Sequence, residues 1–420
     1  MRKKDKIPTP ALFRSLKQRP FALLWSGQTV SRLGDSIYRL ALAWWVLEKT
    51  GSALAMGTVL IFSMLPLLLF VLIGGMVVDR VDRKKLMLFS DLLRGLAVAI
   101  IAWLAFARLL EVWHIYLLSI LFGLVDAFFQ PAYSALVPEV VIAADRPSAN
   151  SLTSMSAQVT GVVGPAVGAA IVAFGGTPLA FALDAGSFII SAACILPMVQ
   201  WSYFLIQQSS SSTSSKLLIK TAWKDILDGL KFVAGSPFLW ITILIASLSN
   251  ITLSGPTGVG LPFLVKDHLN AGVGLLGALY SLFSVGSVIG AIYYGSKIRL
   301  RRRGLLAYFS WIIGAGLLAF FGLNKNILLI EAGAVIMGFC FSGFEQVWVN
   351  SLQELVPNEL LGRVTSLDYL GSYALLPVGY AITGWAIDRF GASQVFFVGG
   401  LIGVAITVLG LLHPAIRRFD

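Results

Sequence analysis

The chain consists almost entirely of apolar runs, each long enough to cross a lipid bilayer, separated by short polar segments. Twelve such runs occupy residues 21–47, 53–78, 86–107, 112–135, 150–174, 178–203, 237–262, 273–296, 304–323, 327–350, 364–386 and 392–412. About 20 helical residues span the hydrocarbon core of a membrane, and a helix satisfies its own backbone polar groups in lipid. The sequence therefore predicts an all-α membrane protein with twelve transmembrane helices.

Composition excludes the other structural classes. Of the 420 residues, 57% are apolar and 13% are charged, whereas a soluble protein is about 25% charged. The two cysteines, Cys194 and Cys340, lie inside apolar runs, so a small disulfide-bonded scaffold is also excluded.

The basic residues predict the orientation of the chain, whose net charge is +11. If the chain crosses the membrane twelve times, 24 of its 32 lysines and arginines lie on the same side as the N-terminus. Five lie on the other side and three lie within spans. Because cytoplasmic loops are enriched in these residues, we expect both termini to be cytoplasmic. The cations cluster at the ends of apolar runs and not on a soluble face, so no nucleic-acid partner is expected.

A short repeat divides the chain into two halves. The sequence ALVPE ends the fourth run and ELVPNE ends the tenth, with an offset of 219 residues between Pro138 and Pro357. The predicted organisation is a retained cytoplasmic tail (1–20), a six-helix bundle (21–204), a cytoplasmic linker (205–236), a second six-helix bundle (237–412) and a cytoplasmic tail (413–420). Two homologous halves suggest a transporter that alternates around a central cavity. The linker contains a basic amphipathic helix, which lies on the membrane surface or, alternatively, is a plain connecting helix.

The segment after the second run has the sequence GMVVDRVDRKK over residues 75–85. A glycine permits close approach of a neighbouring helix, and a carboxylate at the membrane edge can cap the positive end of an opposing helix. A simple basic cap explains the cations of this segment but not Gly75 and Asp79. The pattern resembles the loop motif between the second and third helices of the major facilitator superfamily. The resemblance implies a gating latch formed by Gly75, Asp79, Arg80 and Arg83, with Asp126 as the acidic partner of the loop arginine.

The fifth run contains small residues at helical spacing, namely Gly161, Gly164, Pro165 and Gly168. Such spacing permits close packing, and the proline bends the helix. The pattern resembles the fifth-helix motif of facilitator antiporters, which implies export by exchange. Ordinary packing of small residues is the alternative interpretation.

Further short patterns narrow the resemblance to one branch of the superfamily. They are SRLGD at 31–35, FQPA at 129–132, LVPE at 136–139, ANSL at 149–152 and GRV at 362–364. Together they resemble the macrolide-efflux and enterobactin-exporter branch of bacterial drug:proton antiporters, which implies a multi-pass protein of the bacterial inner membrane. The Arg-x-x-Gln-Gly pattern that many such antiporters carry in helix four is missing from this sequence, so we expect other residues to handle protons.

Charged residues inside apolar spans are costly and are candidates for function. In the first run, Asp35 follows Arg32 by three residues and precedes Arg39 by four, so the three share one helical face. They form either a self-neutralised cluster or part of a cavity in which Asp35 exchanges protons. Asp91 and Arg94, three residues apart in the third run, are expected to pair structurally.

Asp184 and Glu345 lie inside apolar runs without a cation within one helical turn. A buried carboxylate without a partner takes up protons readily. Asp35, Asp184 and Glu345 are therefore the candidates for proton coupling, with a structural contact to a neighbouring helix as the alternative role of the last two.

Polar and aromatic side chains within the runs are candidates for lining a cavity. They are Arg32, Arg39, Gln158, Asn250, Trp348 and Asn350, although helix packing explains the amides equally well.

The three histidines are scattered, so no metal site is expected. No phosphate-binding loop and no nucleophile–base constellation occurs, so we expect no cofactor besides the proton gradient and no enzyme activity.

These observations predict a secondary active transporter that exports an amphipathic small molecule, such as a drug, a macrolide-like or a siderophore-like compound, in exchange for protons by alternating access. A lipid or nutrient transporter on the same scaffold is the nearest alternative, and a non-transporting membrane receptor is the alternative from another class. The expected partners are the substrate, protons and the lipid bilayer, and the expected state is a monomer.

Overall fold

The computed structural model describes residues 11–78, 80–202, 229–297 and 301–420. Within these residues every regular element is a helix, which confirms the all-α prediction. The chain divides into two compact units, Met1–Leu42 with Phe62–Gln207 and Ala43–Ile61 with Gln208–Asp420.

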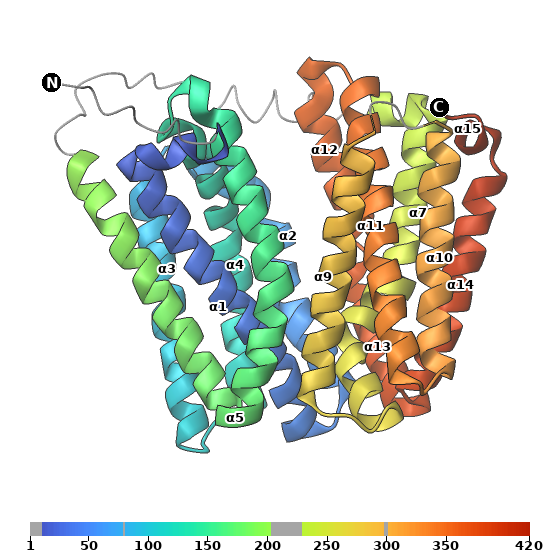
Figure 1. Ribbon diagram of the computed structural model, residues 1–420, viewed down its shortest axis with the longest axis horizontal. Helices are drawn as coiled ribbons and strands as arrows, with labels where there is room; N and C mark the ends of the chain where they lie inside the picture. Colours follow the sequence, from blue (N-terminus) through green and yellow to red (C-terminus); the bar gives the residue numbers. More distant parts are fainter. Residues whose placement is uncertain (1–10, 79, 203–228, 298–300) are drawn as a thin grey trace, which may run out of the picture. The chain divides into compact units, whose positions relative to one another are not determined.

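The first unit is built from long helices that follow one another with short connections (Figure 1). Its described elements are η1 (Ala11–Lys17), α1 (Arg19–Thr50), α2 (Ala53–Val78), α3 (Arg83–Phe106), α4 (Val112–Leu136), η2 (Val137–Glu139), η3 (Ala143–Asp145) and α5 (Arg146–Ser202), of which α1 and α2 also contribute residues to the second unit. Two helices make up α5, because Gly176 has φ 74° and ψ 172° and interrupts the helix. Only glycine adopts such a conformation readily, so the two runs predicted on either side of residue 176 are correct.

Glycines bring α2 and α4 into backbone contact. A Cβ atom at Gly123 of α4 would overlap the carbonyl oxygen of Ser63 in α2, and a Cβ atom at Gly74 of α2 would overlap the carbonyl oxygen of Ala127 in α4. Small residues at a helix interface permit this close approach in membranes. The two helices are therefore in backbone contact at two places along their length.

The second unit begins with α7 (Pro237–Gly255), which continues through the π-helical turn η4 (Pro256–Gly260), α8 (Leu261–Phe263) and the π-helical turn η5 (Leu264–His268). The other described helices are α9 (Val273–Gly295), α10 (Arg303–Leu323), α11 (Ile327–Leu355), α12 (Asn358–Tyr373), α13 (Leu376–Phe390), α14 (Ala392–Leu412) and α15 (Pro414–Arg417). The run predicted over 364–386 is therefore interrupted, because α12 ends at Tyr373 and α13 begins at Leu376. A Cβ atom at Gly338 of α11 would overlap the carbonyl oxygen of Phe283 in α9, so these two helices pack as α2 and α4 do.

The start of α2 belongs to the second unit and is capped by a side chain of α13. The carboxylate of Asp388 accepts hydrogen bonds from the backbone N–H of Ala53 at 2.6 Å and of Leu54 at 3.2 Å, and from the hydroxyl of Ser52 at 2.6 Å. A carboxylate at this position satisfies amide groups that lack partners within the helix and interacts favourably with the helix dipole.

Ten helical segments of the described residues are long and apolar enough to cross a membrane. Among them α5 counts once although it contains two helices, and the charged helix α1 is not included. With these two additions the structure has the twelve membrane helices that the sequence predicts. The predicted amphipathic helix of the linker lies largely outside the described residues, of which 229–235 are helical.

Candidate functional site

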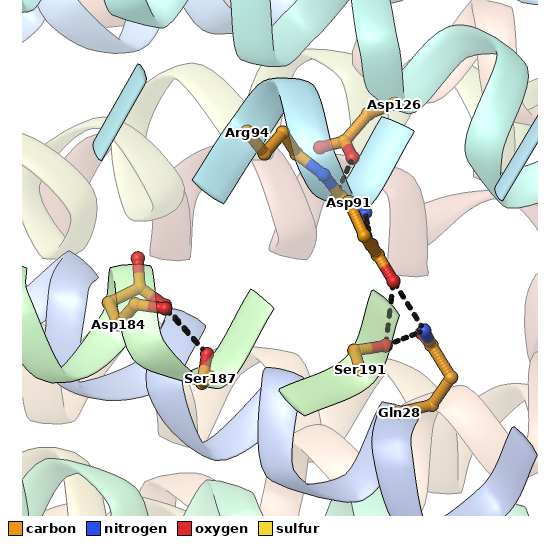
Figure 2. Close-up of polar contacts among 7 residues, drawn as sticks. All are labelled: Gln28, Asp91, Arg94, Asp126, Asp184, Ser187 and Ser191. Carbon is orange, nitrogen blue, oxygen red and sulfur yellow. Dashed lines mark hydrogen bonds and ion pairs between the residues drawn. The ribbon is translucent and has the colours of Figure 1, made fainter. Parts of the chain in front are cut away.

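A buried ion cluster joins α3 and α4 in the first unit (Figure 2). The guanidinium group of Arg94 donates to Asp91 Oδ1 at 2.8 Å and to Asp126 Oδ1 at 3.1 Å. The side chain of Asp91 is fully buried and that of Arg94 is 4% exposed. Two aromatic rings enclose the guanidinium carbon, Phe129 at 4.2 Å and Phe188 at 4.8 Å to the ring centroids. The expected pairing of Asp91 with Arg94 is thus confirmed, and the carboxylate of Asp126 is a second partner of Arg94.

The other oxygen of Asp91 ties the cluster to α1 and α5. It accepts hydrogen bonds from Ser191 Oγ at 2.6 Å and from Gln28 Nε2 at 3.3 Å, and Gln28 also donates to Ser191 at 2.8 Å (Figure 2). One guanidinium group faces two carboxylates, so one negative charge of the cluster is not compensated within it. The side chain of Asp126 is 34% exposed, which makes it the carboxylate of the cluster that is more accessible to solvent.

The predicted partner of Arg83 is wrong. Arg83, at the start of α3, forms an ion pair with Glu139, whereas Asp126 pairs with Arg94. Asp126 lies ten residues before the end of α4, which corresponds to about 15 Å along the helix axis, while Glu139 directly follows that end. In the second unit, Arg303 at the start of α10 donates to Glu354 of α11 at 2.6 Å, so both units contain this type of ion pair.

Other residues of the predicted latch are placed differently from the expectation. Asp79 lies outside the described residues, and Arg80 is exposed. The carboxylate that caps a helix here is Asp82, which accepts a hydrogen bond from the backbone N–H of Lys84 at 3.0 Å at the start of α3. The close helix approach predicted at Gly75 occurs one residue earlier in α2, since a Cβ atom added to Gly75 meets no described atom within 4 Å.

The small residues of the fifth run place α5 against α1. A Cβ atom at Gly164 would lie 2.5 Å from the Cβ atom of Ser36, and one at Gly168 would lie 3.1 Å from the Cα atom of Ile37. Gly161 and Pro165 belong to the same helix. Close helix packing is therefore present, and the exchange role implied by the motif stays a prediction.

Asp35 does not form a self-neutralised cluster with its neighbouring arginines. None of the ion pairs between described residues includes Asp35. Arg32 donates to the carbonyl oxygen of Thr153 at 3.3 Å, and its guanidinium carbon lies 5.2 Å from the centroid of the Tyr133 ring. Asp35 is half-buried and Arg39 is exposed, so the alternative in which Asp35 lines a pathway remains.

Asp184 is a fully buried carboxylate of α5. Its Oδ1 atom accepts a hydrogen bond from Ser187 Oγ at 3.2 Å (Figure 2), and its Oδ2 atom has no hydrogen-bond partner among the described residues. Gly34 of α1 leaves room for this group, because a Cβ atom there would lie 2.6 Å from Asp184 Oδ1. An ionised carboxylate with an unpaired oxygen is costly away from water, so Asp184 is a candidate for carrying a proton.

The second unit contains a cavity of about 710 Å³, the size of a site for a drug-sized ligand. The predicted residues Glu345, Asn250 and Trp348 all line it. The other four predicted cavity residues do not line this cavity. Gln158 is exposed on α5 in the first unit and Asn350 is exposed on α11, while Arg32 and Arg39 belong to α1 in the first unit.

Asp368 of α12 also lines the cavity and is a candidate that the sequence analysis missed. Its Oδ2 atom accepts a hydrogen bond from Trp348 Nε1 at 3.0 Å, and its Oδ1 atom accepts one from Ser372 Oγ at 3.1 Å. The rule that singles out Asp184, a carboxylate inside an apolar run, applies equally to Asp368. Glu345 is exposed to the cavity and not buried as expected, and no hydrogen bond or ion pair joins its carboxylate to another described side chain.

Comparisons with known sequences cover most of the chain. A sequence model of the Major Facilitator Superfamily matches residues 24–379. Macrolide efflux protein A of Streptococcus pyogenes is 23% identical over 402 residues, which cover 95% of this chain and 97% of the relative. Multidrug efflux pump Tap of Mycolicibacterium fortuitum is 28% identical over 425 residues, which cover 96% of this chain and 98% of the relative.

Solved structures show the same fold at low sequence identity. A bacterial homologue of the iron transporter ferroportin, in an inward-facing state, matches with a TM-score of 0.71 and 16% identity, covering 93% of this chain and 98% of that chain. The nucleoside transporter NupG matches with a TM-score of 0.70 and 10% identity, covering 96% of this chain and 100% of that chain. At such identities the likeness concerns the fold alone.

Proposed function

The chain belongs to the Major Facilitator Superfamily, and from this premise we propose that it exports an amphipathic organic molecule in exchange for protons. Two relatives that match it over nearly their whole length are named as efflux proteins, one for macrolides and one for multiple drugs. The proposed substrates are therefore macrolide-like, siderophore-like or other drug-like compounds. Transport by alternating access requires the two halves of such a protein to expose one site to each side in turn.

The observation that carries proton coupling is the fully buried carboxylate of Asp184, one oxygen of which has no hydrogen-bond partner among the described residues. A proton bound to that oxygen removes a charge that the surrounding apolar helices do not compensate. The carboxylates of the Arg94 cluster are ion-paired and support the role less well. A coupling residue needs one state that favours proton binding and another, in contact with water, that favours release.

Two further groups have supporting roles in this proposal. Asp35 lies next to Gly34, the residue of α1 that packs against Asp184, and is the second candidate for proton transfer. The ion pair between Arg83 at the start of α3 and Glu139 of η2, together with Arg80, is the proposed gating element.

Transport into inverted membrane vesicles tests the proposal. With an imposed pH gradient, acid inside, we expect wild-type vesicles to accumulate radiolabelled erythromycin and to release it when a protonophore is added. Asp184→Asn keeps the shape of the side chain but cannot release a proton, so gradient-driven accumulation should be lost while downhill exchange of substrate continues. Glu331→Gln, a half-buried position of α11, is the matched control. Accumulation that ignores the protonophore would contradict proton coupling.

A further inference from the structure

The cavity of the second unit combines acidic and aromatic side chains. Glu345 and Asp368 are its acidic residues, and no lysine, arginine or histidine is among the described residues that line it. Trp311 and Phe344, whose ring centroids are 4.1 Å apart, both belong to its wall. A carboxylate in apolar surroundings is costly unless a positive charge compensates it, so this lining is complementary to a cation.

The internal repeat identifies the equivalent place in the first unit. An offset of 219 residues relates Asp126 to Glu345 and Phe129 to Trp348. Asp126 and Glu345 each lie ten residues before the end of their helix, α4 and α11 respectively. The two units therefore place an acid and an aromatic ring at the same depth of corresponding helices.

The units differ in what lies beside this acid and this ring. In the first unit, the guanidinium group of Arg94 lies between Asp126 and the ring of Phe129. The same offset leads from Arg94 to Ile313, which is followed by Gly314, and neither carries a charge. Gly314 lines the cavity, and a Cβ atom added to it meets no described atom within 4 Å. The second unit thus retains the acid and the ring but has an open cavity where the first unit has its own cation.

We infer that this cavity binds an organic cation, whose charge is held by Glu345 and Asp368 and whose apolar body lies against the aromatic wall. Trp348 and Ser372 hold the carboxylate of Asp368 in place. This side chain therefore loses little conformational entropy when a ligand binds. The rings of Trp311 and Phe344 add cation–π attraction. The inference rests on the proposed function, since it names the class of substrate that the exporter carries.

Equilibrium binding to the purified full chain in detergent, at one pH and without a gradient, tests the inference. The probes, used in separate samples because they pair with each other in solution, are radiolabelled tetraphenylphosphonium and radiolabelled tetraphenylborate, an ion of the same shape and opposite charge. We expect saturable binding of the cation and no saturable binding of the anion. Glu345→Gln and Asp368→Asn should each weaken binding by about tenfold or more, whereas Glu331→Gln, on the same helix as Glu345 but outside the cavity wall, should leave it unchanged.

The comparison of the two units supplies a sharper variant. Gly314→Arg introduces a guanidinium group at the position that follows the equivalent of Arg94, and we expect it to abolish binding of tetraphenylphosphonium. Gly314→Met adds a side chain of similar length without charge, so it should weaken binding less. Equal weakening of binding by Gly314→Arg and Gly314→Met would argue for simple filling of the cavity and against recognition of charge.

The wild-type protein alone can overturn the inference, so the test does not depend on any variant folding. Saturable binding of tetraphenylborate with an affinity similar to that of tetraphenylphosphonium would do so, as would unchanged binding of the cation in folded Glu345→Gln and Asp368→Asn proteins. Because no gradient is present, the result is independent of proton coupling. A protein that binds the cation as expected but ignores a pH gradient contradicts the proposed function alone.

Discussion

Arg94 is the cation of the buried ion cluster in the first unit. It donates to both Asp91 and Asp126 and is enclosed by two aromatic rings. Its removal leaves the fully buried carboxylate of Asp91 without a cation, and breaking a buried ion pair in this way costs about 3–5 kcal/mol. We therefore expect Arg94→Ala to lower the free energy of unfolding by about that amount, measured by denaturant-induced unfolding in detergent micelles.

Arg39→Ala is the matched control, since Arg39 is exposed on α1 and takes part in none of the ion pairs between described residues. Arg94→Lys should recover part of the stability, because lysine keeps the charge but lacks the planar group that bonds to two carboxylates at once. An Arg94→Ala protein as stable as the Arg39→Ala protein would show that the first unit folds without this cluster.

Contacts between residues close in sequence were predictable, and contacts between helices were not. The pairing of Asp91 with Arg94 follows from helical periodicity and is observed. Arg83 begins α3 and Asp126 lies ten residues before the end of α4, so depth along the helices already argued against the predicted pair of these two residues. Which residue of α3 contacts Asp126 instead depends on how α4 is rotated about its axis relative to α3, and one sequence contains no measure of that rotation. For the same reason the spacing around Asp35 suggested an ion cluster that the described residues do not form.

At the scale of helices, the packing of α2 against α4 depends on Gly74 and not on its neighbour Gly75. A Cβ atom at Gly74 would overlap the carbonyl oxygen of Ala127, whereas one at Gly75 meets no described atom within 4 Å. Overpacking of a close contact costs about 1–3 kcal/mol. We expect Gly74→Ala to lower the free energy of unfolding by about that amount and Gly75→Ala to leave it unchanged, measured in the same detergent.

The two variants control each other, because they add the same methyl group to adjacent positions of one helix. Equal destabilisation by both would contradict the assignment of the contact to Gly74. If Gly75→Ala impairs transport without changing stability, the family motif acts at Gly75 through gating and not through the packing of α2 on α4.

The spans were predictable because length and apolar character are properties of the sequence itself. The run predicted at 53–78 coincides with α2, and the run at 392–412 coincides with α14. Interruptions were harder to foresee: the first π-helical turn after α7 and the break between α12 and α13 lie inside the runs 237–262 and 364–386, which the apolar pattern alone predicts as continuous spans. The cavity of the second unit is likewise a product of packing, so the sequence indicated some of its residues but not its place.

At the scale of the whole molecule, an ion pair between an arginine and a glutamate occurs at a similar place in both units. An arginine at the start of α3 or α10 pairs with a glutamate at the end of the following helix, Glu139 or Glu354. The two glutamates are not equivalent in the repeat, since the offset of 219 residues leads from Glu139 to Asn358 and relates Glu354 to Ala135. The missing equivalent of Arg94 is the more informative difference between the units.

The distribution of basic residues leads to a prediction about the whole chain, namely that both ends lie in the cytoplasm. Of 32 lysines and arginines, 24 lie in segments on the side of the N-terminus when the chain has twelve spans, and moving such residues across the membrane is disfavoured. Green fluorescent protein fused after residue 420 should therefore fluoresce, while alkaline phosphatase fused there should be inactive, because its disulfides form only outside the cytoplasm. Fusions at Lys325, between α10 and α11, should give the opposite pattern and serve as the control. An active phosphatase after residue 420 would require an odd number of spans or an inverted chain, and either would contradict the twelve-helix arrangement with cytoplasmic ends.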